Sequence, residues 1–256
     1  MYEPRTYRQL VAGSDLTAFS VMIGETDLLI RADRRLVAAA EKAVRACRDS
    51  IERHARRCPG FLTALEPLRA PGGCPRIVAQ MCAAGAAAGV GPMAAVAGAT
   101  AEHVGRALLR RAEEMIVENG GDIFMRSRRD RIVSIYAGQS SFTHRIGLRV
   151  PAERTPIGIC TSSGTVGHSK SLGTADAVVV AAQDTALADA AATAIANCVK
   201  SDDDVDAAIE WGRKVDGIAH IVVIKGGKLG VWGDLELVAM RPSERIEQWT
   251  QTRIGG

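Results

Sequence analysis

The feature of this sequence that most constrains its fold is a near-continuous apolar run at 175–182, which an alanine-rich segment follows at once. Such a run of valines and alanines is typical of a strand that is buried on both faces of a sheet. Asp184 opens the next segment, which we expect to form a helix as far as about Lys200. The two elements together favour a sheet that is packed by helices.

The spacing of apolar residues indicates further strands and helices along the whole chain. The expected strands lie at 5–11, 16–23, 26–31, 115–118, 123–126, 131–137, 146–150 and 158–161, with a closing hairpin at 218–224 and 229–240. The expected helices lie at 33–57, on both sides of a break at 89–92, at 184–200 and at 202–215, the last with Val205, Ala208, Ile209 and Trp211 facing inward. We interpret this order as an α+β fold in a single domain over 1–256, with a mixed or antiparallel sheet packed by helices and 241–256 as a peripheral tail.

Composition limits the kinds of partner that the protein is expected to bind and the cell compartment in which we expect it. The chain has 256 residues, 47% of them hydrophobic, and its net charge of +3 is too small to indicate a nucleic-acid partner. No stretch approaches the roughly 20 apolar residues that span a bilayer, and the first residues lack the apolar core of a signal peptide. Six cysteines show no Cys-x-x-Cys pair and no zinc spacing. These observations predict a cytoplasmic protein with free thiols and no membrane partner.

Three polar segments are candidates for a functional site, and the first is Asn119-Gly120-Gly121-Asp122, between two apolar strands. Paired glycines permit positive φ angles, which would let backbone amides converge on an oxygen-rich ligand. The same residues also suit an ordinary tight hairpin. The sequence leaves both interpretations open.

The second segment begins with Thr161-Ser162-Ser163-Gly164 and continues through His168. Its hydroxyl and glycine residues offer hydrogen-bond donors for phosphate, and a histidine in this polar setting is suited to act as a general base. The segment is expected between two strands, at a sheet end where ligands often bind. A polar surface loop is the alternative, and we weigh the two equally.

The third segment is the alanine-rich helix that carries Asp189 and Thr193. Residues four apart share a helical face, at about 40° from one another. A carboxylate and a hydroxyl there suit Mg²⁺, which favours oxygen ligands and keeps positions for water and substrate phosphates. The alternative is that Thr193 bonds back to a helix carbonyl and Asp189 is simply exposed, and from these residues alone it is narrowly favoured.

Taken together and in this order, the three segments resemble the ApbE family, the flavin transferases once described as thiamine-biosynthesis lipoproteins. The matching pieces are Asn119-Gly-Gly-Asp122, Thr161-Ser-Ser-Gly164 and Ala188-Asp-Ala-Ala-Ala-Thr-Ala194, within roughly 93–198. The resemblance implies an ApbE-like fold and Mg²⁺ bound by Asp189 and Thr193. It also implies FAD as the donor of FMN to a Thr or Ser of a partner protein.

The sequence departs from that family's pattern at two internal segments, and the lipoprotein signal expected of the family is also not recognised in it. The family's His-x-x-Asp-Pro-x-Thr-Gly segment is replaced by the shorter 167–173, in which His168 is the nearest counterpart. The family's Lys-Gly pair corresponds to Ala97-Gly98, without the lysine. The chain therefore resembles more closely a cytoplasmic ApbE-like subgroup of anaerobic bacteria and archaea, which has been connected with sulfur assimilation toward homocysteine.

Three functions are compatible with these observations. The first is an Mg²⁺-dependent enzyme that cleaves FAD or transfers FMN, with His168 as the base. The second is a binding protein that retains FAD, FMN or a related nucleotide without turnover, as an accessory in sulfur assimilation. In the third, Cys160 carries a persulfide, although a buried structural cysteine is the favoured interpretation. We rank flavin or nucleotide binding first, and leave the oligomeric state open.

Overall fold

The computed structural model of the protein describes residues 15–164 and 173–240. The expected strand at 5–11, the candidate base His168 and the expected tail at 241–256 lie outside the described residues.

Strands and helices follow one another in an order close to the expected one. The strands are β1 (Thr17–Ile23), β2 (Thr26–Ala32), β3 (Met115–Asn119), β4 (Asp122–Arg126), β5 (Arg131–Ser134), β6 (Ile146–Val150), β7 (Ile157–Ser162), β8 (Ala177–Ala182), β9 (Ile218–Lys225), β10 (Lys228–Gly233) and β11 (Glu236–Ala239). The helices are α1 (Val37–Arg57), α2 (Arg76–Ala88), α3 (Val96–Leu108), α4 (Thr185–Cys198) and α5 (Val205–Gly212), with short 3₁₀ turns at Pro59–Leu62, Pro92–Ala95, Ala152–Arg154 and Asp202–Asp204.

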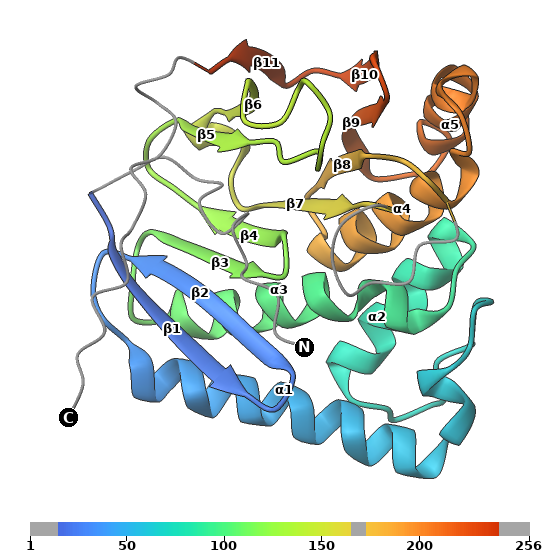
Figure 1. Ribbon diagram of the computed structural model, residues 1–256. Helices are drawn as coiled ribbons and strands as arrows, with labels where there is room; N and C mark the ends of the chain where they lie inside the picture. The colour runs from blue at the N-terminus through green and yellow to red at the C-terminus, as the bar shows by residue number, and fades with distance from the viewer. Residues whose placement is uncertain (1–14, 165–172, 241–256) are drawn as a thin grey trace.

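Two antiparallel sheets organise the molecule (Figure 1). The larger has eight strands in the order β1-β2-β3-β4-β7-β8-β9-β10, and the smaller has three in the order β11-β6-β5. Every pairing within both sheets is antiparallel. The predicted α+β class, with an antiparallel sheet packed by helices, is therefore confirmed.

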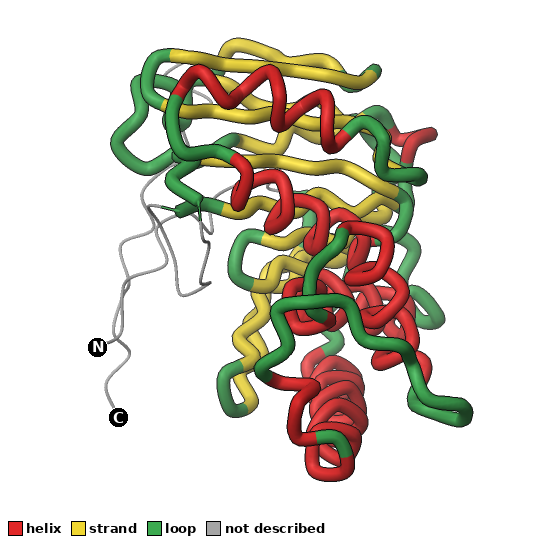
Figure 2. The backbone as a smooth tube through the Cα atoms, turned by 90° about the vertical axis from the view of Figure 1, so that its right-hand side faces the viewer, coloured by secondary structure: helices red, strands yellow, loops and turns green. Residues whose placement is uncertain are grey.

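Helices cover one face of the large sheet and the small sheet packs on the other, so the molecule has two cores. Figure 2 shows the helices lying along the strands. Strand β8 contributes to both cores, because successive side chains point to opposite faces. Val178 and Val180 belong to the core under the helices, whereas Val179 and Ala181 belong to the core against the small sheet. The prediction of a strand buried on both faces is confirmed.

The C-terminal strands differ from the expected hairpin. Strand β9 pairs with β10 as predicted, but the single strand expected at 229–240 is wrong. It divides after Gly233, whose φ of +116° favours glycine, and β11 then pairs with β6 in the other sheet. The inward orientation expected for Trp211 is also wrong, because Trp211 is 36% exposed.

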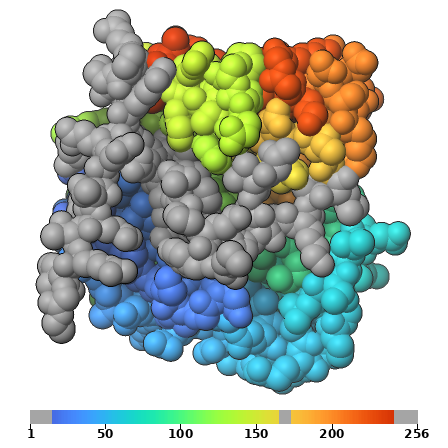
Figure 3. Space-filling model, viewed as in Figure 1, coloured from blue at the N-terminus to red at the C-terminus, as the bar shows by residue number. Residues whose placement is uncertain are grey.

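The surface in Figure 3 follows these layers. The region of β5 and β6 lies in the upper part of this face, and α1 lies along the lower part.

Among the described helices, none is on its own long and apolar enough to cross a bilayer. Helix α2 and the segment Pro92–Leu108 meet that criterion only as a pair that is bent by 107°.

Candidate functional site

The first polar segment forms the tight turn between β3 and β4. Asn119 and Asp122 are cross-strand partners, and Gly120 and Gly121 between them have φ angles of +69° and +105°. Two positive φ angles are typical of a type I′ hairpin turn. The Gly121 N–H donates to Oε1 of Glu118 at 2.8 Å, so it serves the turn itself and is not available to a ligand.

Strand alternation directs the side chains at both ends of this turn to the helix face of the sheet. Phe124 lies in the core under the helices, and Asp122, two residues earlier, shares its face. Asn119 lies opposite Asp122, and its Nδ2 donates to the carbonyl of Ala97, in the first turn of α3, at 3.1 Å. The hairpin thus presents an amide and a carboxyl group to α3 and α4.

Helix α4 brings Asp189 to the same region. Oδ2 of Asp189 accepts the backbone N–H of Gly98 in α3 at 2.8 Å. The two helices approach closely at this point, since a Cβ on Gly98 would lie 2.4 Å from the Thr185 carbonyl oxygen and 2.8 Å from Cβ of Asp189. Asp189 is half-buried and faces the protein interior, so the alternative of a simply exposed carboxylate is not observed.

Asp122 and Asp189 form a carboxyl pair with strongly perturbed acidity. Burial raises the pKa of Asp122 well above its usual range, and the neighbouring charge of Asp189 raises it further. Burial also raises the pKa of Asp189, to about 7, against the opposing effect of the Gly98 and Ala97 N–H groups. Asp122 is the more buried of the two, so we expect protonation of the pair to fall mainly on Asp122.

Strand β7 contributes the backbone N–H of Thr161 to the carboxyl pair, in place of the hydroxyl group that the sequence predicts. The Thr161 N–H donates to Oδ1 of Asp122 at 3.2 Å. The Thr161 side chain, however, lies on the face of the small sheet, because its cross-strand partner Val179 belongs to that core. Ser162 pairs with Val178 and shares the helix face. Of these two hydroxyl groups, only that of Ser162 lies on the face of the carboxyl pair.

Two further predicted residues, Ser163 and Gly164, follow the end of β7. Ser163 is half-buried and Gly164 is exposed. The Gly164 N–H donates to the carbonyl of Ala175 at 2.9 Å, which ties this residue to the segment before β8. The backbone of Gly164 is therefore used in the fold.

Cys160 lies beside the carboxyl pair, but its environment makes the thiol unreactive. It is fully buried, its Sγ donates to the Thr185 carbonyl at 3.4 Å, and burial together with the charge of Asp122 raises the pKa of its thiol well above the usual value. A buried thiol of raised pKa is a weak nucleophile. The interpretation of Cys160 as a structural cysteine fits this environment better than a persulfide carrier.

Thr193 lies one helical turn beyond Asp189 on α4 and is half-buried. Within the described ranges there is no group of three or more His, Cys, Asp or Glu side chains that could hold a metal ion. The region therefore offers two carboxyl groups and hydroxyl oxygens, with His168 outside the described residues.

The sequence pattern did not indicate that Gly98 is a positioning residue. It draws attention to Gly98 only for its missing lysine neighbour, although the Gly98 N–H orients Asp189. An isolated glycine within a helical pattern is a signal of close packing, and it could have identified this position.

Comparisons with known proteins identify the family of the chain. A family model described as AbpE bacteria matches residues 8–230. The protein belongs to this family. It is a member of the ApbE-like superfamily, and related chains of the same kind occur in methanogenic archaea. It is 41% identical over 225 residues to a UPF0280 protein of Methanocaldococcus jannaschii, covering 85% of this chain and 91% of that one. It is 44% identical over 222 residues to a UPF0280 protein of Methanopyrus kandleri, covering 83% and 89%.

Solved structures of ApbE share the fold of this family member. The flavinyl transferase ApbE of Pseudomonas stutzeri in its apo form matches with a TM-score of 0.55 at 15% identity, over 85% of this chain and 94% of that chain. The flavin transferase ApbE of Vibrio cholerae matches with a TM-score of 0.55 at 11% identity, over 85% and 96%. The predicted ApbE-like fold is therefore confirmed.

Proposed function

We propose that the protein binds a flavin nucleotide, FAD or FMN, together with Mg²⁺, between the β3–β4 turn, the end of β7 and α4. The observation that supports this most strongly is the convergence of three segments that are far apart in the sequence. Asp122 accepts the Thr161 N–H and lies close enough to Asp189 for their charges to interact. Fold similarity to flavin transferases makes a flavin the first candidate for the ligand.

The side chains present are chemically suited to Mg²⁺. Two neighbouring carboxyl groups with raised pKa values repel one another when both ionise, and a cation would relieve that repulsion. Mg²⁺ commonly binds one or two protein carboxylates and fills its other positions with water and substrate phosphates. Asp189 and Thr193 would hold the ion, with Asp122 as a further carboxylate.

Each protein group would then have a defined task. The Gly98 N–H keeps the Asp189 carboxylate in one orientation, and the Asn119 amide fixes the hairpin to α3. Bound Mg²⁺ would neutralise pyrophosphate charge and act as a Lewis acid. His168 would accept the proton of the attacking group. In a transfer reaction that group is a Ser or Thr hydroxyl of a protein acceptor, and in cleavage it is water.

Two measurements test this proposal. The purified protein should quench the fluorescence of added FAD in the presence of Mg²⁺, and Asp189→Asn should weaken that binding by about tenfold or more, since it removes a charged ligand. Asp216→Asn, an exposed aspartate outside the site, is the matched control. Equal FAD binding by Asp189→Asn and the wild type, with and without Mg²⁺, would contradict the proposal.

Turnover is assayed separately from binding. Release of AMP from FAD that depends on Mg²⁺ and is lost in Asp189→Asn would identify the protein as an enzyme. Tight binding of FAD with no release of AMP would identify it instead as a binding protein, for which an accessory role in sulfur assimilation is then the proposal to pursue.

A further inference from the structure

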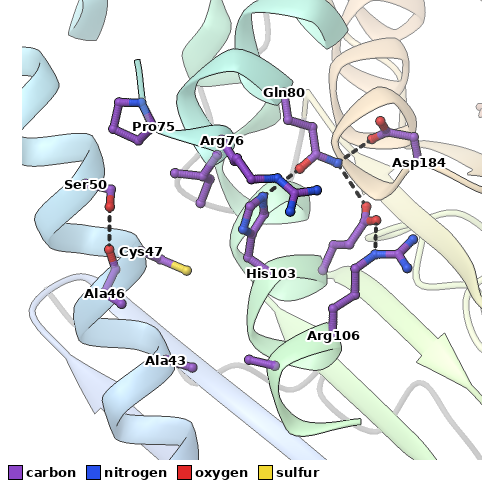
Figure 4. A pocket seen from close by; sticks show the side chains of 13 residues that line it. Ala43, Ala46, Cys47, Ser50, Pro75, Arg76, Gln80, His103, Arg106 and Asp184 are labelled. Carbon is purple, nitrogen blue, oxygen red and sulfur yellow. Dashed lines mark hydrogen bonds and ion pairs between the residues drawn. The ribbon is translucent and has the colours of Figure 1, made fainter. Parts of the chain in front are cut away.

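A cleft lies among the helices, and none of the carboxyl-pair residues lines it. It has a volume of about 630 Å³ and is formed by α1, the start of α2, the second half of α3 and the residue that precedes α4 (Figure 4). This volume is within the roughly 300–1,000 Å³ of typical small-molecule sites. The wall formed by α2, α3 and Asp184 carries charged and polar side chains, whereas the opposite wall, from α1, carries mostly small apolar ones.

The acidic groups of the polar wall already have donors from the protein. Glu102 is buried; its Oε1 accepts Arg106 Nε at 2.6 Å and its Oε2 accepts the Thr185 N–H at 2.8 Å. Asp184 caps α4 by accepting the Leu187 N–H at 3.1 Å. Both carboxylates are therefore held in place by donors of the protein.

Gln80 links these carboxylates to His103 and fixes its tautomer. Gln80 Nε2 donates to Glu102 at 3.2 Å and to Asp184 at 3.0 Å, so its Oε1 is the atom that accepts from His103 Nε2 at 2.9 Å. Burial lowers the pKa of His103, which is therefore neutral at neutral pH. A neutral ring that donates through Nε2 presents Nδ1 as an acceptor.

Arg76 is an exposed arginine of the lining and, in contrast to Arg106, has no ion-pair partner among the described residues. Figure 4 shows its guanidinium beside His103, and the charges of Arg76 and Arg106 both act on the pKa of His103. A guanidinium in this position is suited to a carboxylate, sulfonate or phosphate group.

The opposite wall comes from α1 and is made of small side chains. Ala43, Ala46 and Cys47 line it, together with Ser50, whose Oγ donates to the Ala46 carbonyl at 2.7 Å. Burial raises the pKa of the Cys47 thiol to about 11, so this wall carries no charge at neutral pH. Small side chains leave room for a flat apolar group to lie against the helix.

We infer that this cleft is a second ligand site, which binds a small organic anion with its charged group on Arg76 and its apolar body against the Ala43–Cys47 wall of α1. The site is separate from the carboxyl pair and does not depend on the function proposed for that pair. The residues that line the cleft also include Asp184, which caps the helix that carries Asp189.

A pair of fluorescent probes tests the inference on the full chain. 1-Anilinonaphthalene-8-sulfonate joins aromatic rings to an anion, and N-phenyl-1-naphthylamine has the same rings without the anion. Arg76→Gln should weaken binding of the sulfonate by about tenfold and leave the uncharged probe unchanged, because only the charge-assisted hydrogen bond is lost. Ala46→Trp should fill the cleft and abolish the binding of both. Arg110→Gln, an exposed arginine outside the cleft, is the matched control.

Three results would overturn the inference. They are no saturable binding of the sulfonate by the wild type, equal binding of it by Arg76→Gln and the wild type, and binding that survives in folded Ala46→Trp. Circular dichroism verifies that each variant folds. If Ala46→Trp does not fold, Arg76→Gln still tests the site. FAD binding is measured in parallel and should be unchanged in Arg76→Gln, which separates failure of this inference from failure of the flavin proposal.

Discussion

The backbone N–H of Gly98 in α3 donates to Oδ2 of Asp189 in α4 at 2.8 Å. The bond forms because Gly98 has no side chain where the two helices meet, with the Thr185 carbonyl oxygen only 2.4 Å from the position that a Cβ would take. Asp189 is therefore held in one orientation toward Asp122, and the packing of two helices determines the geometry of the candidate site.

Gly98→Ala tests that dependence on packing. The added methyl group must separate α3 from α4, so we expect a loss of about 1–3 kcal/mol in the free energy of unfolding and weaker FAD binding in the presence of Mg²⁺. Gly72→Ala is the matched control, since nothing lies within 4 Å of its Cβ position. Chemical denaturation and FAD fluorescence measure the two effects. Unchanged values for both in Gly98→Ala would be incompatible with the close approach.

Asp122→Asn tests the charge repulsion in the carboxyl pair. The pKa of Asp122 is raised in the folded protein, so the folded state is favoured while this group is protonated and loses stability as the pH rises above the unfolded value of 3.8. In the presence of EDTA, the variant should be more stable than the wild type by about 1–3 kcal/mol near pH 8, and the difference should shrink at lower pH. A variant that is less stable at every pH would show that ionised Asp122 stabilises the fold.

His220 should make the protein sensitive to acid. Burial lowers its pKa from 6.5 to about 4. Its Nδ1 accepts the N–H of Leu235, a residue between β10 and β11, at 3.3 Å. A lowered histidine pKa gives stability that is fully present above pH 6.5 and is lost as the pH falls toward 4. We expect a loss of up to about 3 kcal/mol from this group over that range. His220→Asn should lose less stability than the wild type in urea denaturation over the same range, and parallel losses would rule His220 out as the cause.

Thiol labelling tests the assignment of Cys160 as a structural residue. Cys58 is exposed, whereas Cys160 and Cys47 are buried and have raised thiol pKa values. Iodoacetamide should modify Cys58 in the native protein well before it modifies Cys160, because alkylation requires an accessible thiolate. Mass spectrometry of the peptides gives the order. Early modification of Cys160 would restore the persulfide hypothesis.

Much of the fold was predictable from the sequence, because the strongest patterns are local. The apolar run at 175–182 and the alanine-rich helix after it were both assigned correctly as β8 and α4. The division of 229–240 was not predictable from its composition, since the apolar pattern is similar in β10 and β11 and the change of sheet depends on tertiary contacts with β6. Trp211 was misplaced because helical spacing alone does not show how far the sheet extends under α5.

The candidate site was predicted in part. The sequence indicated the residues Asp122 and Asp189, and the structure brings them together. It did not indicate that Thr161 would use its backbone N–H, since the face of a strand's last residues depends on register with β8. It also did not indicate the Gly98–Asp189 bond, which joins residues 91 positions apart.

The most direct test of the account is a crystal structure with FAD and Mn²⁺ in place of Mg²⁺, in which anomalous scattering locates the cation. We predict one strong anomalous peak in contact with Asp189 and Thr193, with the FAD pyrophosphate bound beside it. A cation bound away from Asp189, or FAD bound away from the region between the β3–β4 turn and α4, would contradict the proposed site.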